Sequence, residues 1–299
     1  MLNLPRLRML RELHRRGSLA QVARALNYTP SAVSQQLTLL EREVGVPLLQ
    51  RVGRGVVLTH EAVALAAHAD AVIARLELAE SELAQSRTRV GGVLRVASFQ
   101  TVLLAIAPTA LTQLAEEHPD LQVEIAHQEV DEAYSGLLAH DFDVILGEEY
   151  PGRTAGVRPG THQETLHRDP MLLATPRAGA LADLPTRLPD LAEAPWALEP
   201  LDSLTGVWQR DVITAAGLEP RIRFETPDPL LQAHLVSSGH AVALLPGLIP
   251  PAYTEAVRLT ELPGRPHRTL HTAVREGRAG HPAIVAFRRA LAAAAAQAA

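Results

Sequence analysis

Four polar side chains share one face of a segment whose opposite face has the apolar spacing of a helix. They are Ser31, Ser34, Gln35 and Thr38. Glutamine can form two hydrogen bonds with the edge of adenine in the major groove of DNA, and serine and threonine bond base edges or phosphates. These side chains therefore offer the chemistry of base reading, with Ser31 placed to fix the DNA backbone. The alternative is the polar face of a solvated helix.

The residues before this segment predict the helix and turn that would position it. Ser18 and Gln21 fit the S-x-x-Q capping box, which predicts a first short helix beginning at Leu19. Thr29 is a good N-cap, and Pro30 suits the first position of a second helix. That helix is predicted to run along an apolar stripe, Val33, Leu37, Leu40 and Val44, and to end at Gly45.

A basic β-hairpin is predicted directly after the second helix. Two short apolar runs, 48–49 and 56–58, flank a glycine-containing turn. Arg51 and Arg54 project from this hairpin, where an arginine can contact phosphates or the minor groove. Because arginines are also common on solvated hairpins, a purely exposed pair is the alternative.

Charge divides along the chain in the same way. Residues 1–58 contain nine arginines and three glutamates, a net charge of +6, whereas residues 59–299 contain 19 arginines and 30 acidic residues, a net charge of −11. A basic module joined to an acidic body indicates that only the first part meets a polyanion.

The segment GSLAQVARALNYTPSAVSQQLTLLEREVGVPLLQRVGRGVVLT resembles the amino-terminal domain of bacterial LysR-type transcriptional regulators. The family usually has phenylalanine where Leu49 stands, which is a conservative apolar change. The resemblance implies an N-terminal winged helix-turn-helix, a long linker helix and a two-lobed α/β effector domain like the periplasmic binding proteins. It also implies a homodimer or homotetramer on double-stranded DNA with an interrupted dyad operator, a small-molecule effector, and RNA polymerase as a further candidate partner.

The residues after the hairpin predict a linker helix that pairs with a second copy. Residues 60–89 lack glycine and proline, and apolar residues recur with alternating spacings of four and three. These are Leu58, Ala62, Leu65, Ala69, Val72, Leu76, Ala79 and Leu83. A heptad seam of this length favours a coiled coil in residues 60–90, with Gly91 and Gly92 as a hinge. A helix docked on its own domain is the alternative.

The remaining residues, 91–299, show the alternating strands and helices of an open α/β sheet, and the β-α-β-α-β order of residues 93–147 predicts that the sheet is parallel. Strands are predicted at 93–99, 121–127, 142–147, 171–175, around 196–198, and at 221–225, 241–246 and 268–274, and helices at 101–117, 130–139, 204–216, 228–238 and 281–296. The family resemblance implies two lobes, 91–162 with 266–299 and 163–265. The crossovers are expected near 160–166 and 264–268.

Ligands of open α/β sheets bind outside the carboxyl ends of the strands, and three loops there are candidates for the effector site. They contain Ser98, Phe99, Gln100 and Thr101; Gly147, Glu148 and Glu149; and Leu201, Asp202, Ser203, Leu204 and Thr205, with Gln128 as a further candidate. The hydroxyls of Ser98 and Thr101, like those of Ser203 and Thr205, serve equally well as helix caps. Glu148 and Glu149 would disfavour an anionic effector if they point into the cleft, and a solvated pair is the alternative.

Other functional classes find little support. The chain has no cysteine, no P-loop, no G-x-S-x-G elbow and no H-E-x-x-H pair, so we expect neither an enzyme nor a metal site or cofactor. The charged first residues and the lack of long apolar runs predict a cytoplasmic protein. An exported solute carrier would not explain residues 18–59. An architectural DNA-binding protein without an effector is a further alternative.

Overall fold

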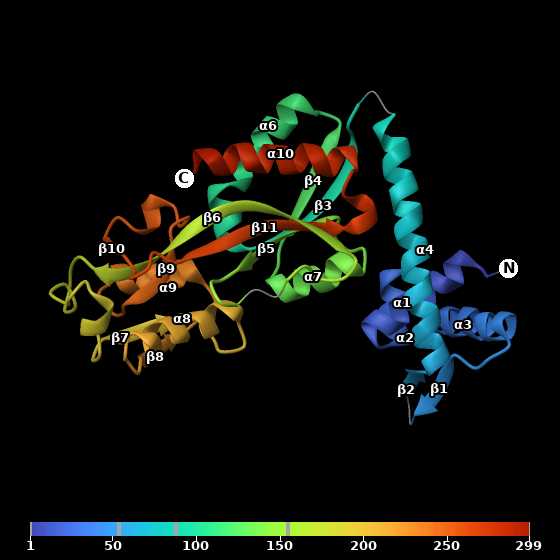
Figure 1. Cartoon of the computed structure of the whole chain (residues 1–299), viewed down its shortest axis with the longest axis horizontal. Coiled ribbons are helices and arrows are strands. Elements are labelled where there is room, and N and C mark those ends of the chain that lie inside the picture. The colour runs from blue at the N-terminus through green and yellow to red at the C-terminus, as the bar shows by residue number, and fades with distance from the viewer. Residues whose placement is uncertain (1, 53–54, 87–88, 154–155, 299) are drawn as a thin grey trace.

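The computed structural model describes residues 2–52, 55–86, 89–153 and 156–298. Figure 1 shows a small module, in blue, around the lower half of one long helix, α4 (His60–Gln85). A larger α/β body lies beside the upper half of the same helix. None of the described helices is long and apolar enough to cross a membrane.

The N-terminal module has the predicted helix-turn-helix and hairpin. Its elements are α1 (Leu4–Arg16), α2 (Leu19–Ala25), α3 (Pro30–Val44), β1 (Leu49–Val52) and β2 (Gly55–Leu58). The predicted caps are confirmed, because Ser18 Oγ accepts from the Gln21 N–H at 3.3 Å and Thr29 Oγ1 accepts from the Ala32 N–H at 3.2 Å. Asn27 leaves α2 with a φ of 56°, a conformation that asparagine tolerates.

The residues of the predicted heptad seam differ in burial between the two halves of the linker helix α4. Ala62 and Ala69, in its first half, are fully buried in the core that α4 shares with α1 and α3. Val72, Leu76 and Leu83, farther along, are 46%, 43% and 72% exposed. The first half is thus docked on its own module, which was the alternative reading, and the second half leaves an apolar row on the surface.

The body is built on a seven-stranded sheet in the order β10-β6-β11-β5-β3-β4, with β9 also paired to β6. The strands are β3 (Gly92–Ser98), β4 (Leu121–His127), β5 (Val144–Glu149), β6 (Thr161–Pro176), β9 (Ala243–Pro246), β10 (Val257–Glu261) and β11 (His267–Arg275). A separate parallel pair joins β7 (Pro195–Leu198) to β8 (Arg221–Glu225). The sheet is mixed rather than purely parallel, because β11 runs antiparallel to both β5 and β6.

Helices cover both faces of this sheet. They are α5 (Gln100–Ala105), α6 (Ala107–Glu117), α7 (Val130–Leu138), α8 (Leu204–Ala215), α9 (Pro229–Ser237) and α10 (Pro282–Gln297). In the first lobe α10 packs on α6 over one large apolar core, and α7 covers the opposite face over a smaller core. The second lobe has two cores of its own.

Two segments of the chain join the lobes, β6 and the turn at 262–266 between β10 and β11, and the sequence predicted only part of them. The crossovers were expected near residues 160–166 and 264–268, but β6 continues unbroken from Thr161 to Pro176. Its first half pairs with β11 and its second half with β9 and β10, so that one strand belongs to both lobes (Figure 1). Residues 161–170 lack the apolar alternation of a strand, and pairing on the sheet holds them extended instead.

One predicted helix and the end of the linker helix differ most from the structure, and β10 was not predicted. The helix expected over 101–117 is broken at Ile106 into α5 and α6. Pro108 causes the break, because its missing N–H and its ring suit only the first turn of a helix. The linker helix ends at Gln85, before the predicted end at residue 89.

Candidate DNA-binding face and effector cavity

The polar face of α3 is open to solvent at three of its four predicted residues. Ser31, Gln35 and Thr38 are exposed and Ser34 is half-buried, whereas Val33, Leu37 and Leu40 on the opposite face are fully buried. Ser31 Oγ lies 3.0 Å from Thr29 Oγ1. Within the described residues, the side chains of Ser34, Gln35 and Thr38 form no hydrogen bonds, so their donors and acceptors are available to a partner.

Two arginines of α1 are held by other residues of the chain. Arg6 donates to Gln36 Oε1 at 3.0 Å and pairs with Glu43. Arg11 is only 1% exposed and pairs with the equally buried Glu12, so this arginine is neither a phosphate contact nor a solvated side chain. In the hairpin, the side chain of Arg51 and the whole of Arg54 lie outside the described residues.

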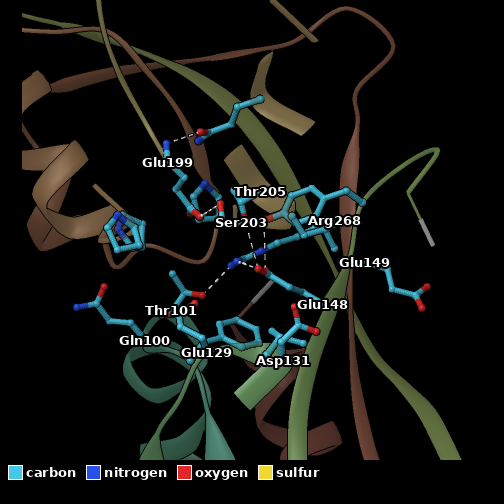
Figure 2. Close-up of a pocket in the computed structure, with 18 of the residues that line it drawn as sticks. Gln100, Thr101, Glu129, Asp131, Glu148, Glu149, Glu199, Ser203, Thr205 and Arg268 are labelled. Atoms are coloured by element: carbon cyan, nitrogen blue, oxygen red, sulfur yellow. Dashed lines mark hydrogen bonds and ion pairs between the residues drawn. The ribbon is translucent and has the colours of Figure 1, made fainter. Parts of the chain in front are cut away.

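A cavity of about 750 Å³ lies between the two lobes of the body (Figure 2). Nine of the thirteen candidate effector residues line it, and they come from both lobes: Phe99, Gln100, Thr101, Glu148, Glu149, Asp202, Ser203, Leu204 and Thr205. Ser98, Gly147, Gln128 and Leu201 do not line it. Ser98 is buried and donates to the Phe99 carbonyl oxygen, the Gln128 backbone N–H bonds to the Ser98 carbonyl oxygen, and Leu201 is exposed.

Arg268, which the sequence analysis did not single out, lies at the centre of the cavity (Figure 2). It is 4% exposed, and its guanidinium contacts Glu148 Oε2 at 2.8 Å and Asp169 Oδ2 at 2.6 Å. Its Nη2 also donates to Thr101 Oγ1 at 2.8 Å, so Thr101 holds this arginine and does not cap α5. Burial would lower the pKa of Arg268, but Glu148 and Asp169 outweigh that effect and raise it.

The hydroxyls of the second lobe have their own partners. Ser203 is the N-cap of α8, since its Oγ accepts from the Gly206 N–H at 2.9 Å while donating to Glu199. Thr205 Oγ1 lies 3.0 Å from the hydroxyl of Tyr150, which is completely buried. Burial, followed by the neighbouring Glu148, raises the pKa of Tyr150, so its hydroxyl stays protonated.

Glu199 is the second cavity residue that sequence reasoning missed. It is the first residue after β7, at the carboxyl end of a parallel strand, and this position was the signal that could have identified it. Burial, and then the charge of Glu148, raise the pKa of Glu199 to about 8. No comparable signal marks Arg268, because β11 is antiparallel to its neighbours.

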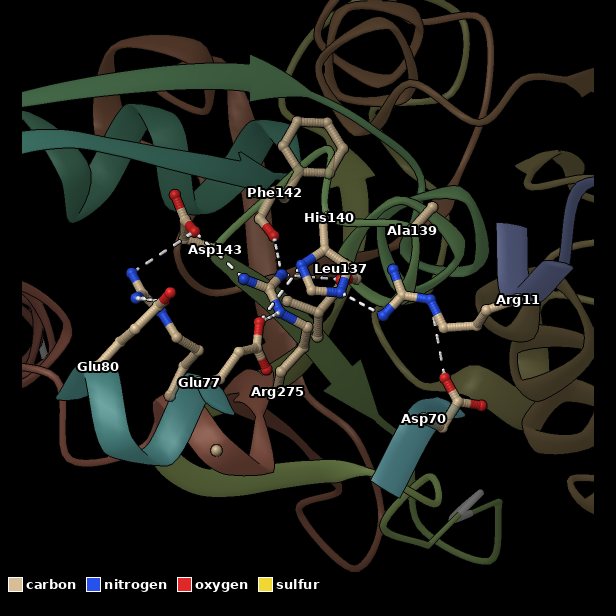
Figure 3. A network of polar contacts seen from close by, with 12 residues as sticks. Arg11, Asp70, Glu77, Glu80, Leu137, Ala139, His140, Phe142, Asp143 and Arg275 are labelled. Atoms are coloured by element: carbon tan, nitrogen blue, oxygen red, sulfur yellow. Dashed lines mark hydrogen bonds and ion pairs between the residues drawn. The ribbon is translucent and has the colours of Figure 1, made fainter. Parts of the chain in front are cut away.

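A polar network joins the N-terminal module to the body (Figure 3). His140, in the turn after α7, accepts from Arg11 Nη1 through its Nε2 at 2.8 Å, and its Nδ1 lies 3.3 Å from Glu77 of α4. Glu77 in turn pairs with Arg275 of β11 at 2.6 Å. Burial, then Arg275 and Arg11, lower the pKa of His140 to about 2, so the imidazole is neutral and its Nδ1–H faces Glu77.

The fold and these two sites together define a class of protein. A helix-turn-helix module with an open polar face, joined to a two-lobed body with a central cavity, is the architecture of a DNA-binding regulator that responds to a small molecule. The model of the bacterial regulatory helix-turn-helix protein, lysR family, matches residues 4–63, and the model of the LysR substrate binding domain matches residues 87–296. The chain belongs to the LysR family of DNA-binding transcriptional regulators.

Individual relatives agree with this assignment. The transcriptional regulator GbpR of Rhizobium radiobacter is 28% identical over 79% of this chain and 79% of its own length. DmlR of Escherichia coli is 30% identical over 69% of this chain and 66% of its own length. Full-length OxyR from Pseudomonas aeruginosa has a TM-score of 0.71 at 18% identity over 97% of this chain and 95% of its own. CbnR bound to its target DNA has a TM-score of 0.56 at 22% identity, with coverages of 98% and 99%.

Proposed function

We propose that Ser34, Gln35 and Thr38 read bases in the major groove, while Ser31, Arg51 and Arg54 contact the phosphate backbone. The open polar face of α3, set above a fully buried apolar stripe, carries the assignment of the four α3 residues, and the assignment of Arg51 and Arg54 rests on the sequence. Residues 1–59 form the DNA-binding domain, 60–90 the linker and 91–299 the regulatory domain, with lobe boundaries near 162 and 266. Because its proposed target is DNA, we place the protein in the cytoplasm.

Fluorescence anisotropy on the DNA upstream of the gene itself, against a scrambled duplex, tests this function over a series of salt concentrations. A sequence-specific regulator should prefer the native DNA by about 10³-fold or more. Equal binding to both duplexes, with a steep salt dependence, would favour an architectural protein instead.

Gln35→Ala should weaken binding to the preferred operator by about 1–3 kcal/mol and relax base preference at one position, because a bidentate glutamine–adenine contact is lost. Competition anisotropy against single-base operator variants measures both effects. The matched control is Gln36→Ala, one residue away, because Gln36 is held by Arg6 and faces α1. Unchanged base preference in Gln35→Ala would remove this residue from the reading face.

The exposed second half of α4 supports pairing with another copy of the chain. We propose that Val72, Leu76, Ala79 and Leu83 form this contact, which places two recognition helices on one dyad. Leu76→Asp should convert the dimer or tetramer to smaller species in sedimentation velocity, since a charge would be buried at the seam. Ala67→Asp, on an exposed position outside the seam, is the control and should leave the mass unchanged.

The cavity is proposed as the effector site, and β11 connects it to the linker. This strand carries Arg268 at the cavity and Arg275 at the contact with Glu77 of α4. An effector that favours one arrangement of the lobes would shift β11, and through α4 it would alter dimer spacing and DNA bend.

A further inference from the structure

The lining of the cavity carries a large excess of negative charge. Among the described residues that line it, eight are aspartate or glutamate and two are arginine. Both arginines are already neutralised, since Arg268 pairs with Glu148 and Asp169, and Arg158 pairs with Asp131 while lying 4.0 Å from the centre of the Tyr134 ring. The Arg268 guanidinium is therefore not free to receive an anionic effector, whereas Arg158 is 33% exposed and its pair with the exposed Asp131 is a surface ion pair.

Three helices that begin at the cavity, α7, α8 and α9, do not reverse this balance, whereas the six-residue α5 begins there with neither a side-chain cap nor an acidic residue in its first turn. The start of a helix carries about half a positive charge, which favours an anion nearby. At α9 the carboxylate of Asp228 already accepts from two backbone N–H groups, and at α8 the Ser203 hydroxyl caps the first turn. The first turn of α7 contains Asp131 and Glu132, and Glu129 precedes it. The termini of α7, α8 and α9 are thus each matched by the chain itself.

Glu199 stands out among the remaining carboxylates because it is largely removed from water and its carboxylate pairs with no cation among the described residues, although Arg210 donates to its backbone carbonyl oxygen. Its Oε2 accepts from Ser203 Oγ at 2.9 Å, and it forms no ion pair within the described residues. A carboxylate that is removed from water beside a second carboxylate resists ionisation, and the pKa of Glu199 is accordingly raised to about 8. A positive charge placed at this point would restore the ionised form.

An independent observation on the other lobe also indicates a hydrogen-bond donor in the cavity. Gln100 lines the cavity, and its Oε1 is buried without a donor in the described structure. A buried amide oxygen without a partner is costly, and an ammonium or guanidinium group has several N–H donors and no acceptor. The chain's own guanidiniums already lie over two aromatic rings of this cavity, Tyr134 and Phe99, which shows that its surfaces accept cations.

We propose that the effector of this regulator is a small organic cation with an ammonium or guanidinium group, bound between Glu199 of the second lobe and Gln100 of the first. The inference rests on the proposed effector role of the cavity and specifies its ligand. The volume of about 750 Å³ accommodates molecules of metabolite size. Glu129, exposed at the edge of the first lobe, adds electrostatic attraction for the cation.

The test uses the full-length protein and four probes that share a four-carbon chain. Putrescine and agmatine are the cations, 1,4-butanediol is the neutral control and succinate is the anion, each at millimolar concentration. The cations should raise Tm by about 2 °C or more and the other two should not. Isothermal titration at pH 7 in buffers of different ionisation enthalpy should show the release of about one proton per bound cation, because binding ionises Glu199.

Three variants locate the effect. Glu199→Gln should reduce cation affinity about tenfold or more and abolish proton release, while its amide oxygen can still accept from Ser203. Glu129→Gln, at an exposed position where folding is not at risk, should weaken the same binding about two- to threefold. Glu193→Gln, exposed and outside the cavity lining, should match the wild type.

Absence of a Tm shift with both cations, or a larger shift with succinate, overturns the proposal. Cation binding that is unchanged in Glu199→Gln overturns it as well. Fluorescence anisotropy on the operator, measured in parallel, separates a failure of this proposal from a failure of the proposed function. If succinate shifts the DNA affinity, the effector is not a cation, but the protein is still an effector-controlled regulator. Loss of specific DNA binding under all conditions would instead refute the proposed function.

Discussion

Arg268→Ala should lower the free energy of unfolding by about 3–5 kcal/mol, because it leaves buried carboxylates without their counter-charge. Asp169 is fully buried, and its remaining partner is the Leu248 N–H at 2.9 Å. Among the described residues, Glu148 would keep only the hydroxyls of Tyr150 and Thr205, each at 3.3 Å. Urea unfolding at pH 7, followed by circular dichroism, measures the change.

The matched control is Arg289→Ala. Arg289 also pairs with a glutamate, Glu117, but their side chains are 71% and 54% exposed, and such surface pairs contribute less than about 1 kcal/mol. If both variants lose the same small amount, then the Arg268 guanidinium is hydrated in solution and the cavity is more open than the structure shows.

The elements with local signals were predictable from the sequence, and those held by distant partners were not. The caps at Ser18 and Thr29 and the glycine at position 45 act within a few residues, so the helix-turn-helix could be deduced in full. The first half of β6 has no such signal, because its conformation is imposed by β11, which lies about a hundred residues later in the chain.

The same distinction applies to the cavity. The rule that ligands bind at the carboxyl ends of parallel strands placed Phe99, Gln100 and Glu148 correctly at its lining. Ser98 is the last residue of β3, and its side chain is buried in the fold. Arg268 enters from an antiparallel strand, and only the three-dimensional pairing of β11 with β5 brings it to Glu148. Rules based on local sequence therefore identify residues at the rim of the cavity and miss Arg268 at its centre.

The docking of the N-terminal module on the body involves another buried ionisable group, His140. It lies between three elements, and the charged groups around it are Glu77 of α4, Arg275 of β11, and Arg8, Arg11 and Arg15 of α1. Its backbone has a φ of 65°, in the left-handed region. Glu77 is the only acidic group in this set, so the folded protein strongly disfavours a charged imidazole.

Acid should therefore destabilise the docked structure through His140. The pKa of this group is about 2 in the folded state, because of burial and then Arg275 and Arg11, against an ordinary value of 6.5. Between these pH values the unfolded chain binds a proton that the folded chain does not. The contribution of His140 to the free energy of unfolding is thus fully present above pH 6.5 and declines as the pH falls. The decline is about 3 kcal/mol between pH 6.5 and pH 4 for this one group.

His140→Asn should remove that decline, because asparagine tolerates the left-handed backbone and does not titrate. Urea unfolding at several pH values between 7 and 4 should show a shallower loss of stability than in the wild type, offset by a small cost at pH 7 for the lost Arg11 contact. His68→Asn, at an exposed position of α4, should reproduce the wild-type curve. Identical curves for His140→Asn and the wild type would mean that the imidazole is open to water, and hence that α1 does not remain docked against the turn after α7 in solution.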